Sequence, residues 1–327
     1  MTEILVFCET NEEHLDSSAG ELIAAGRKLS SEISLPVSAV IFNPNAEMTK
    51  EASSLGADKV YKVNDPKFEH KTDEIFTHGL FETCKQIKPT VILAAKTSLG
   101  RNVAARTAYR LKSTVAQDCM DISGDKNTGL ISVTRPVYGG NAQAVFTFTK
   151  PLNQMVILRV KTFEPLPIDN TKIAEEITLE IPIPDAKLKV IDTVKQEFEG
   201  VRLEDASVIV GGGRGLGGPE AFEHLEELAK ILNGAVGASR AVCDAGWLDH
   251  SYQIGLTGKT VTPDLYITIA ISGASQHMAG CSASKNIIAI NKDGDANIFK
   301  EASFGVVGDW EQILPSFTAT ARELTQS

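Results

Sequence analysis

The chain has few of the residue patterns that build metal centres or disulfide frameworks. Its five cysteines are odd in number and widely separated, and no C-x-x-C pair occurs. The six histidines are equally scattered, without H-x-x-x-H spacing. Zinc sites and iron–sulfur clusters need closely spaced ligands, and a disulfide framework needs paired cysteines, so the pattern argues against all three. We therefore expect no bound metal.

Long apolar runs and basic clusters are also missing. No uninterrupted apolar stretch approaches the roughly 18 residues that a membrane-spanning helix needs. Residues 1–10 form one short apolar run and then turn acidic, unlike a signal peptide. The formal net charge of −10 argues against a broad surface for nucleic acid or anionic lipid. These features predict a soluble, cytoplasmic protein that binds no nucleic acid and does not insert into membranes.

Length and periodicity indicate two α/β domains. At 327 residues and 43% apolar content, the chain can form two separate hydrophobic cores. In the first half, short apolar runs alternate with stretches of helical period, which is typical of a mostly parallel sheet flanked by helices. The expected strands are residues 4–7, 37–42, 59–63 and 91–95, and the expected helices are residues 15–29, 46–55, 73–86 and 100–111.

The period then changes. Residues 129–135, 142–149 and 154–161 alternate around a turn at 138–141, which predicts antiparallel strands added to the first sheet. Residues 163–185 contain four prolines and no sustained period, so we expect an extended segment there. We place the domain boundary near Lys189. This gives an N-terminal α/β domain over residues 1–188 and a C-terminal, Rossmann-like domain over residues 189–327.

Strand and helix alternate again in the C-terminal domain. The expected strands are residues 206–211, 235–238, 265–271, 286–290 and 303–307, and the expected helices are residues 219–232, 275–281 and 309–320. In open parallel sheets, ligands bind at the carboxyl ends of the strands, where the loops of this half fall.

The turn G-G-G-R-G-L-G-G at residues 211–218 is the most informative stretch. It follows the apolar run V-I-V and precedes apolar side chains at helical spacing, which predicts strand, loop and helix. Exposed backbone amides, a helix N-terminus and the Arg214 cation would together suit a phosphate or pyrophosphate. We expect a nucleotide-containing ligand, although a turn that only packs helix on sheet would use the same residues.

Residues 213–218 also satisfy G-x-G-x-x-G, the fingerprint of NAD-binding folds. That fingerprint expects an acidic residue about 20 positions later to hold the ribose, but Ser239 and Arg240 follow the next strand. Arg240 could instead bind a 2′-phosphate. An NADP-dependent oxidoreductase is therefore an alternative, and a nucleotide-sensing module without redox activity is another.

Three further loops of this half carry polar residues at strand ends. Residues 272–277, S-G-A-S-Q-H, form a small-residue turn that would supply more amide donors or would simply cap a helix. His277 is a ring-contacting candidate or an ordinary core histidine. The flexible loop at residues 253–259 could approach a flat ring, and Asn291 suits an adenosine or ribose contact. In the first half, Thr97 or Ser98 explains the turn at 93–101 as a helix cap rather than a second anion site.

Motifs for nucleophilic catalysis are absent. There is no G-x-S-x-G and no cysteine beside a histidine. A site rich in ligand-holding groups but poor in acid–base machinery indicates that a cofactor carries the chemistry.

Five segments of the second half resemble, in order and spacing, the alpha subunit of electron transfer flavoprotein. They are V-I-V-G-G-G-R-G (208–215), V-G-A-S-R-A-V-C-D-A-G (236–246), T-G-K (257–259), I-S-G-A-S-Q-H-M-A-G (271–280) and I-A-I-N-K-D (288–293). The first half resembles the family more loosely, through R-P-V-Y-G-G-N-A (135–142). The resemblance implies an FAD-binding C-terminal domain and a heterodimer with a beta subunit. It also implies electron transfer from an acyl-CoA-type or other dehydrogenase.

The resemblance also implies roles for individual residues. Arg214 and the turn Ser272, Gly273, Ala274, Ser275 and Gln276 would hold the pyrophosphate. Ser239 would contact the cofactor, the loop of Ile254, Gly255 and Leu256 would lie against it, and Asn291, Asp309 and Trp310 would lie near the adenosine. Arg240 over the flavin ring and His277 at its pyrimidine edge would favour the negatively charged, one-electron-reduced flavin, and Thr257 would hydrogen-bond N5.

One position departs from the family. Leu256 stands where the family usually has glutamine, which puts one cofactor contact and the usual potential in doubt. The resemblance also leaves open whether the protein is a simple shuttle or part of a bifurcating complex that oxidises NADH.

Overall fold

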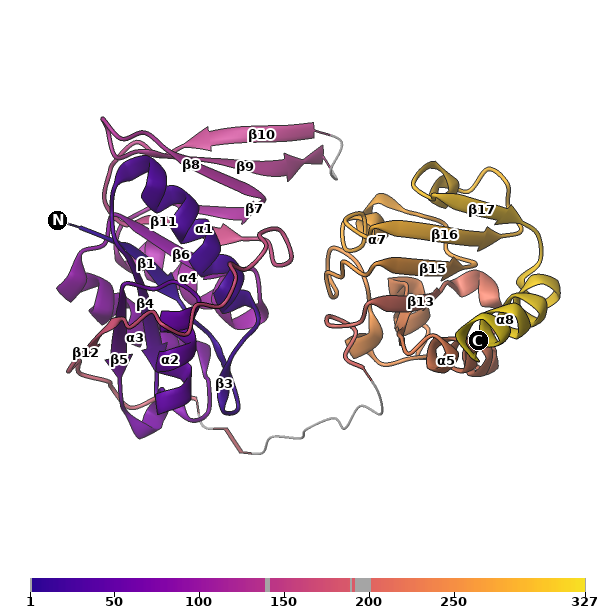
Figure 1. Cartoon of the computed structure of the whole chain (residues 1–327), viewed down its shortest axis with the longest axis horizontal. Coiled ribbons are helices and arrows are strands. Elements are labelled where there is room, and N and C mark those ends of the chain that lie inside the picture. The colour runs from indigo at the N-terminus through magenta and orange to yellow at the C-terminus, as the bar shows by residue number, and fades with distance from the viewer. Residues whose placement is uncertain (1, 139–141, 189, 192–200, 327) are drawn as a thin grey trace. The chain divides into compact units, whose positions relative to one another are not determined.

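The computed structural model describes residues 2–138, 142–188, 190–191 and 201–326. It divides the chain into two compact units, residues 1–193 and 194–327. Each unit is a parallel sheet flanked by helices (Figure 1), which confirms the predicted fold class. The boundary predicted at Lys189 lies outside the described residues. Within the described ranges, no helix is both long and apolar enough to cross a membrane.

The N-terminal unit is built on a seven-stranded sheet with the order β12-β5-β4-β1-β6-β11-β7, and every pairing in it is parallel. Its strands are β1 (Ile4–Phe7), β4 (Val37–Phe42), β5 (Lys59–Val63), β6 (Val91–Ala95), β7 (Val115–Cys119), β11 (Gln154–Leu158) and β12 (Glu175–Thr178). Its helices are α1 (Ser18–Ile33), α2 (Ala46–Ser54), α3 (Asp73–Ile87) and α4 (Ser98–Arg110).

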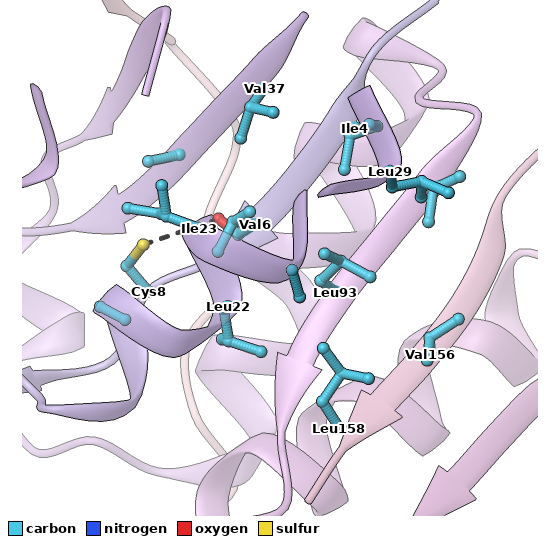
Figure 2. Packing of buried hydrophobic residues seen from close by; sticks show 14 of the residues in the cluster. Ile4, Val6, Cys8, Leu22, Ile23, Leu29, Val37, Leu93, Val156 and Leu158 are labelled. Carbon is cyan, nitrogen blue, oxygen red and sulfur yellow. Dashed lines mark hydrogen bonds between the residues drawn. The ribbon is translucent and has the colours of Figure 1, made fainter. Parts of the chain in front are cut away.

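The alternation of side chains along β1 explains why helices cover both faces of this sheet. Ile4 and Val6 pack on one face with α1 residues such as Leu29 (Figure 2). Leu5 and Phe7 point to the opposite face and pack with residues of α3 and α4. Each such side chain contributes roughly 1.5–3 kcal/mol by leaving water, so the two cores hold the sheet between its helical layers.

The antiparallel prediction is only half right. Strands β8 (Asp121–Gly124), β9 (Ile131–Val137) and β10 (Ala142–Thr147) do form an antiparallel sheet, but it is separate from the seven-stranded one. The third predicted strand is β11, which pairs in parallel with β6 and β7 inside the main sheet. All five residues of β11 are buried, and a strand covered on both faces belongs in a parallel sheet. Part of the predicted turn at 138–141 lies outside the described residues.

Two other expectations in this half need correction. The proline-rich segment contains strand β12, which pairs with β5 as the edge strand of the sheet, so the segment is not wholly irregular. Helix α1 begins at Ser18 rather than at residue 15, because a short hairpin of β2 (Thr10–Asn11) and β3 (His14–Leu15) precedes it. The predicted cap of α4 is confirmed, since the Thr97 hydroxyl accepts the Gly100 amide at 2.8 Å.

The C-terminal unit is a five-stranded parallel sheet with the order β14-β13-β15-β16-β17. Its strands are β13 (Val208–Gly212), β14 (Ala235–Ala238), β15 (Leu265–Ile269), β16 (Asn286–Asn291) and β17 (Phe304–Val307), and its helices are α5 (Phe222–Ile231), α6 (Arg240–Asp244), α7 (Ser275–Met278) and α8 (Trp310–Gln326). From β13 the chain first adds β14 on one side and then crosses to add β15 on the other side, so the order of the strands reverses between β13 and β15. Such a reversal opens a crevice at the carboxyl ends of the two strands.

Candidate functional site

A cleft of about 940 Å³ lies in the C-terminal unit, at the carboxyl edge of its sheet. Its walls come from the segments that follow β13, β14, β15 and β16, so it includes the point where the strand order reverses. This volume is at the upper end of the range found for small-molecule and cofactor sites. The sheet order therefore opens a cleft at the edge where the sequence pattern predicts a ligand site.

The glycine turn after β13 forms one wall. Gly213 donates its amide to the Ile269 carbonyl at 2.9 Å, which draws the turn against the end of β15. A Cβ atom at this position would lie 2.0 Å from the Ala270 carbonyl oxygen, so only glycine permits the approach. Arg214 then opens a short 3₁₀ turn, Arg214–Leu216, and its exposed side chain lines the cleft.

The predicted contribution of a helix N-terminus to this wall is wrong. Helix α5 begins at Phe222, after the 3₁₀ turn Pro219–Ala221, and neither segment lines the cleft. The first amides of a 3₁₀ turn have no partner within that turn, so the 3₁₀ turn at Arg214 supplies the donors instead.

Arg240 lines the opposite part of the cleft, at the start of α6. Its Nε atom lies 3.2 Å from a carboxylate oxygen of Asp244, one helical turn later, and Asp244 also lines the cleft. Both side chains are at least half exposed, so this ion pair contributes little to stability. The ion pair instead changes the electrostatics of the cleft. The sequence predicted Arg240 as an isolated cation, but the negative charge of Asp244 lies beside it.

The loop after the 3₁₀ turn His250–Tyr252 forms a third wall. Gly255 has a φ of 143°, in a region open chiefly to glycine, and a Cβ atom there would meet the Gln276 carbonyl oxygen at 2.8 Å. Leu256 donates its amide to that same carbonyl at 2.7 Å, while its side chain is 49% exposed. The loop is thus held by backbone contacts, and residues 256 and 257 are exposed.

Gln253 is a residue of this wall that sequence reasoning did not single out. It is 4% exposed, and its Nε2 donates to the Thr257 hydroxyl at 3.0 Å. Its Oε1 lies 3.1 Å from Nδ1 of His250. Because the Thr257 oxygen accepts from Gln253, the hydroxyl proton of Thr257 is available to donate to another group.

His277 is another buried polar residue of the cleft. It is 7% exposed, its Nε2 lies 2.9 Å from the Tyr266 hydroxyl, and its Nδ1 has no hydrogen-bond partner among the described residues. Burial lowers the pKa of His277 to about 4. An interaction with the Ile254 backbone raises the pKa and so opposes this shift to a smaller extent, although no hydrogen bond of regular geometry joins that backbone to Nδ1. The imidazole is therefore neutral at pH 7.

The end of β16 forms the last wall. The Asn291 side chain donates to the Ile271 carbonyl at 2.9 Å and accepts the Asp293 amide at 3.0 Å, so it ties this loop to the end of β15. Asp293, Asp295 and Asn297 also line the cleft. These acidic and amide groups were not predicted, because the sequence shows them only as a polar loop after a strand.

The structure gathers twelve of the predicted site residues at the cleft. They are Arg214, Ser239, Arg240, Ile254, Gly255, Leu256, Thr257, Ser272, Ala274, Gln276, His277 and Asn291. Gly273, Ser275, Asp309 and Trp310 do not line it. Trp310 instead packs in the core beside α5, where its ring lies 5.9 Å from that of His224.

The residues fit a nucleotide cofactor. Two arginines face the cleft, the backbone approaches closely at Gly213, and a buried imidazole nitrogen lacks a partner. Among the described lining residues, no hydrogen bond joins a nucleophilic side chain to a histidine or a carboxylate, and no described group of histidines, cysteines and acids could hold a metal. Fold and site together are those of a doubly wound nucleotide-binding domain, with a cleft whose lining suits holding a cofactor rather than reacting with a substrate.

Comparison with known proteins gives the family. Residues 4–184 match the electron transfer flavoprotein domain, and residues 202–282 match the electron transfer flavoprotein FAD-binding domain. The chain is similar to the electron transfer flavoprotein subunit alpha of Thermoanaerobacterium thermosaccharolyticum, with 40% identity over 325 residues and 98% of both chains covered. It is 36% identical to the subunit alpha of Bacillus subtilis over 323 residues, again with 98% of both covered. Protein FixB of Azorhizobium caulinodans is 34% identical over 327 residues, which cover 98% of this chain and 88% of that protein.

The chain therefore belongs to the electron transfer flavoprotein family, as an alpha subunit whose C-terminal domain binds FAD. The predicted family and cofactor are confirmed. The alternative of an NADP-dependent oxidoreductase finds no support in these matches, and the side chain that it required, Arg240, is paired with Asp244.

Proposed function

We propose that the cleft holds FAD and that the chain carries electrons as one half of a heterodimer with a beta subunit. The observation that carries the assignment of the cleft is its position at the strand reversal of the matched FAD-binding domain, together with the unpartnered Nδ1 of His277. The N-terminal domain, residues 1–188, would contact the beta subunit, and residues 189–327 would hold the cofactor. Electrons would pass between a dehydrogenase, such as one of the acyl-CoA type, and an acceptor.

The residues divide by what they offer a bound FAD. Arg214 and the turns at Arg214–Leu216 and at residues 272–276 offer a cation and amide donors for the pyrophosphate. Ser239 offers a hydroxyl, and Asn291 holds the loop beside the adenosine portion. Asp309 and Trp310 stay predictions for that portion, although they lie outside the lining of the cleft.

The groups assigned to the flavin ring are Arg240, Thr257 and His277. FAD supplies the electron-transfer chemistry when bound, and these residues set its environment. Arg240 is a cation whose effect Asp244 reduces. Thr257 offers a hydroxyl proton because Gln253 occupies its oxygen, and His277 offers a neutral ring. A single cation about 4 Å from a forming negative charge contributes roughly 4 kcal/mol at an effective dielectric of 20, so a charge at the Arg240 position would act strongly on the flavin potential.

We further place this activity in the cytoplasm. All five cysteines of the chain are free and buried, as expected of a protein that is made and kept in a reducing compartment.

The test is to purify the chain together with its beta subunit and to record the absorption spectrum. A yellow heterodimer that releases FAD on denaturation supports the proposal, and a colourless heterodimer that stays colourless after incubation with FAD contradicts it. Counting flavins then separates the two forms of the activity. One FAD per heterodimer indicates a simple shuttle, whereas two, with oxidation of NADH, indicate bifurcation.

A further inference from the structure

Tyr266 and His277 form a buried pair at the cleft that the roles above leave unexplained. Tyr266 is fully buried on β15, and its hydroxyl lies 2.9 Å from Nε2 of His277 on α7. The two rings lie 6.0 Å apart and within 29° of parallel. Apart from a weak interaction of His277 with the Ile254 backbone, neither polar group has a second partner among the described residues, and no hydrogen bond of regular geometry reaches the buried Nδ1 of His277.

The surroundings of the hydroxyl leave it little freedom. On the neighbouring strand, a Cβ atom at Gly211 would lie 2.4 Å from the Tyr266 hydroxyl oxygen, so the absence of a side chain there makes room for it. Burial raises the pKa of Tyr266 well above its usual value, so the hydroxyl keeps its proton at neutral pH. The pair therefore contains one hydroxyl proton and, on the neutral imidazole, one ring proton.

Two arrangements of these protons are possible. If Nε2–H donates to Tyr266, the hydroxyl proton has no acceptor and Nδ1 is a second unpaired group. If the hydroxyl donates to Nε2, the ring proton sits on Nδ1, which is then the one donor without a partner. Each enclosed unpaired polar group costs about 1–3 kcal/mol, so the second arrangement is the more stable.

We propose that Tyr266 is a positioning residue that locks His277 in the Nδ1–H form, so that a neutral imidazole donates a hydrogen bond to an acceptor atom of the ligand in the cleft. This inference rests on the proposed FAD site, in which the acceptor is a carbonyl oxygen or ring nitrogen at the edge of the flavin. Nε2 is occupied by Tyr266, so Nδ1 is the nitrogen left for the ligand.

The lock has a consequence for the flavin. A donor proton on Nδ1 favours negative charge on the acceptor atom, whereas a bare lone pair there would repel it. Losing the hydroxyl of Tyr266 frees the ring to place its proton on Nε2, which would turn Nδ1 into that lone pair. Tyr266 would thus act on the flavin through His277 and without touching it.

The experiment uses the heterodimer with ¹⁵N-labelled histidine, and His277→Gln identifies the resonances of His277. In the wild type we expect a protonated Nδ1 and an unprotonated Nε2 with an accepted hydrogen bond. In Tyr266→Phe we expect the proton to move to Nε2 and the flavin midpoint potential to fall. FAD binding should weaken only two- to tenfold, the effect of one neutral hydrogen bond.

Tyr109→Phe is the matched control, because it removes the same atom from a side chain that is 85% exposed on α4 of the other domain. It should leave the His277 resonances and the potential unchanged. A wild-type His277 protonated on Nε2 would overturn the inference, and this result needs no variant to fold. So would a Tyr266→Phe protein with an unaltered tautomer and potential. A colourless heterodimer would instead contradict the FAD proposal, while the tautomer read in the same sample still decides the role of Tyr266.

Discussion

At the scale of the residue, Arg240 shows how an unpredicted neighbour changes a predicted role. The sequence supplies a cation at a strand end, but the carboxylate of Asp244 lies 3.2 Å from its Nε atom in the same cleft. Arginine and aspartate four positions apart are adjacent on a helix, so this spacing could have revealed the pair. In the proposed FAD site, the electrostatic field at the flavin would depend on the difference between these two opposite charges.

This pair predicts opposite shifts of the flavin potential. Arg240→Ala should lower the midpoint potential of the bound flavin, and Asp244→Asn should raise it, because one removes a cation and the other a competing anion. Each shift should correspond to about 1–4 kcal/mol. Potentiometric titration of the heterodimer measures both. Arg322→Ala, an exposed arginine on α8 paired with Glu227, serves as the control. Shifts of the same sign for both variants would rule out the charge argument.

Arg214 is expected to bind rather than to tune. Arg214→Ala should raise the FAD dissociation constant roughly 10- to 100-fold, which corresponds to the 1.5–3 kcal/mol of a hydrogen bond with a charged group. The midpoint potential should change little, since the phosphates lie away from the redox-active ring. Fluorescence of released FAD measures the affinity. An unchanged dissociation constant would remove Arg214 from the phosphate site.

Leu256 allows a test in which a substitution should strengthen the binding of FAD. Its side chain is 49% exposed and its amide already bonds to Gln276, so Leu256→Gln should change the free energy of unfolding by less than about 0.5 kcal/mol. In the proposed site a glutamine amide would add a contact with the flavin ring, so FAD should dissociate more slowly. Stopped-flow release of FAD measures this rate, and Leu256→Met controls for side-chain length. Equal rates for the two variants would mean that the family glutamine makes no cofactor contact.

At the scale of the element, strand β1 and helix α4 of the N-terminal domain meet at a partly buried carboxyl group. Glu9 follows β1, and the Thr97 hydroxyl that caps α4 donates to it at 2.5 Å. Burial raises the pKa of Glu9 from 4.5 to about 7, and the hydrogen bond from Thr97 only partly offsets this. Glu9, in the loop after β1, thus contacts the first turn of α4.

The raised pKa fixes the sign of a pH effect. Between pH 4.5 and about 7 the folded state keeps a proton that the unfolded state has lost, so stability falls as the pH rises through this window. Glu9→Gln should therefore unfold with a free energy roughly 1–3 kcal/mol higher than the wild type at pH 8. At pH 4 the difference should vanish. Urea unfolding at both pH values tests this, and an equal difference at both would contradict the assignment.

The elements also show what sequence patterns could and could not predict. Strands such as β4 and β5 are short runs of mostly apolar residues that can be recognised from the sequence, and they have the predicted bounds. Strand β11 was assigned to the wrong sheet, because a short apolar run does not reveal its pairing partner. Strand β12 was missed because its residues are mostly exposed at a sheet edge, where neither burial nor alternation marks a strand.

At the scale of the whole molecule, the same limit applies to the site. The glycine turn and the loops at strand ends were predictable, since parallel topology brings strand ends to one edge. The partners inside the site were not. The contact of Tyr266 with His277 depends on two chain segments eleven residues apart, and that of Gln253 with Thr257 depends on how a loop folds back on itself. Side-chain pairs of this kind follow from packing, which the pattern of one chain does not specify.

Because the two domains have separate hydrophobic cores, we expect FAD to stabilise the C-terminal domain and not the N-terminal one. Saturating FAD should slow amide hydrogen exchange in β13, β15 and β16, next to the cleft, and leave β1 and β4 unchanged. At a ligand concentration 100 times the dissociation constant, the stabilisation is about 2.7 kcal/mol, or roughly a hundredfold in the exchange rate. Exchange of the heterodimer with and without added FAD, read by mass spectrometry, provides the comparison. Equal protection of both domains would contradict separate responses.

The enclosed thiols give each domain a reporter of its own. Cys8 and Cys119 lie in the core of the N-terminal unit and Cys281 in that of the C-terminal unit, and burial raises the pKa of each to about 12. Thiolates, not thiols, attack alkylating reagents, so these sulfurs should stay unlabelled until the surrounding strands open. The order in which iodoacetamide marks them during heating would then tell which half of the chain melts first.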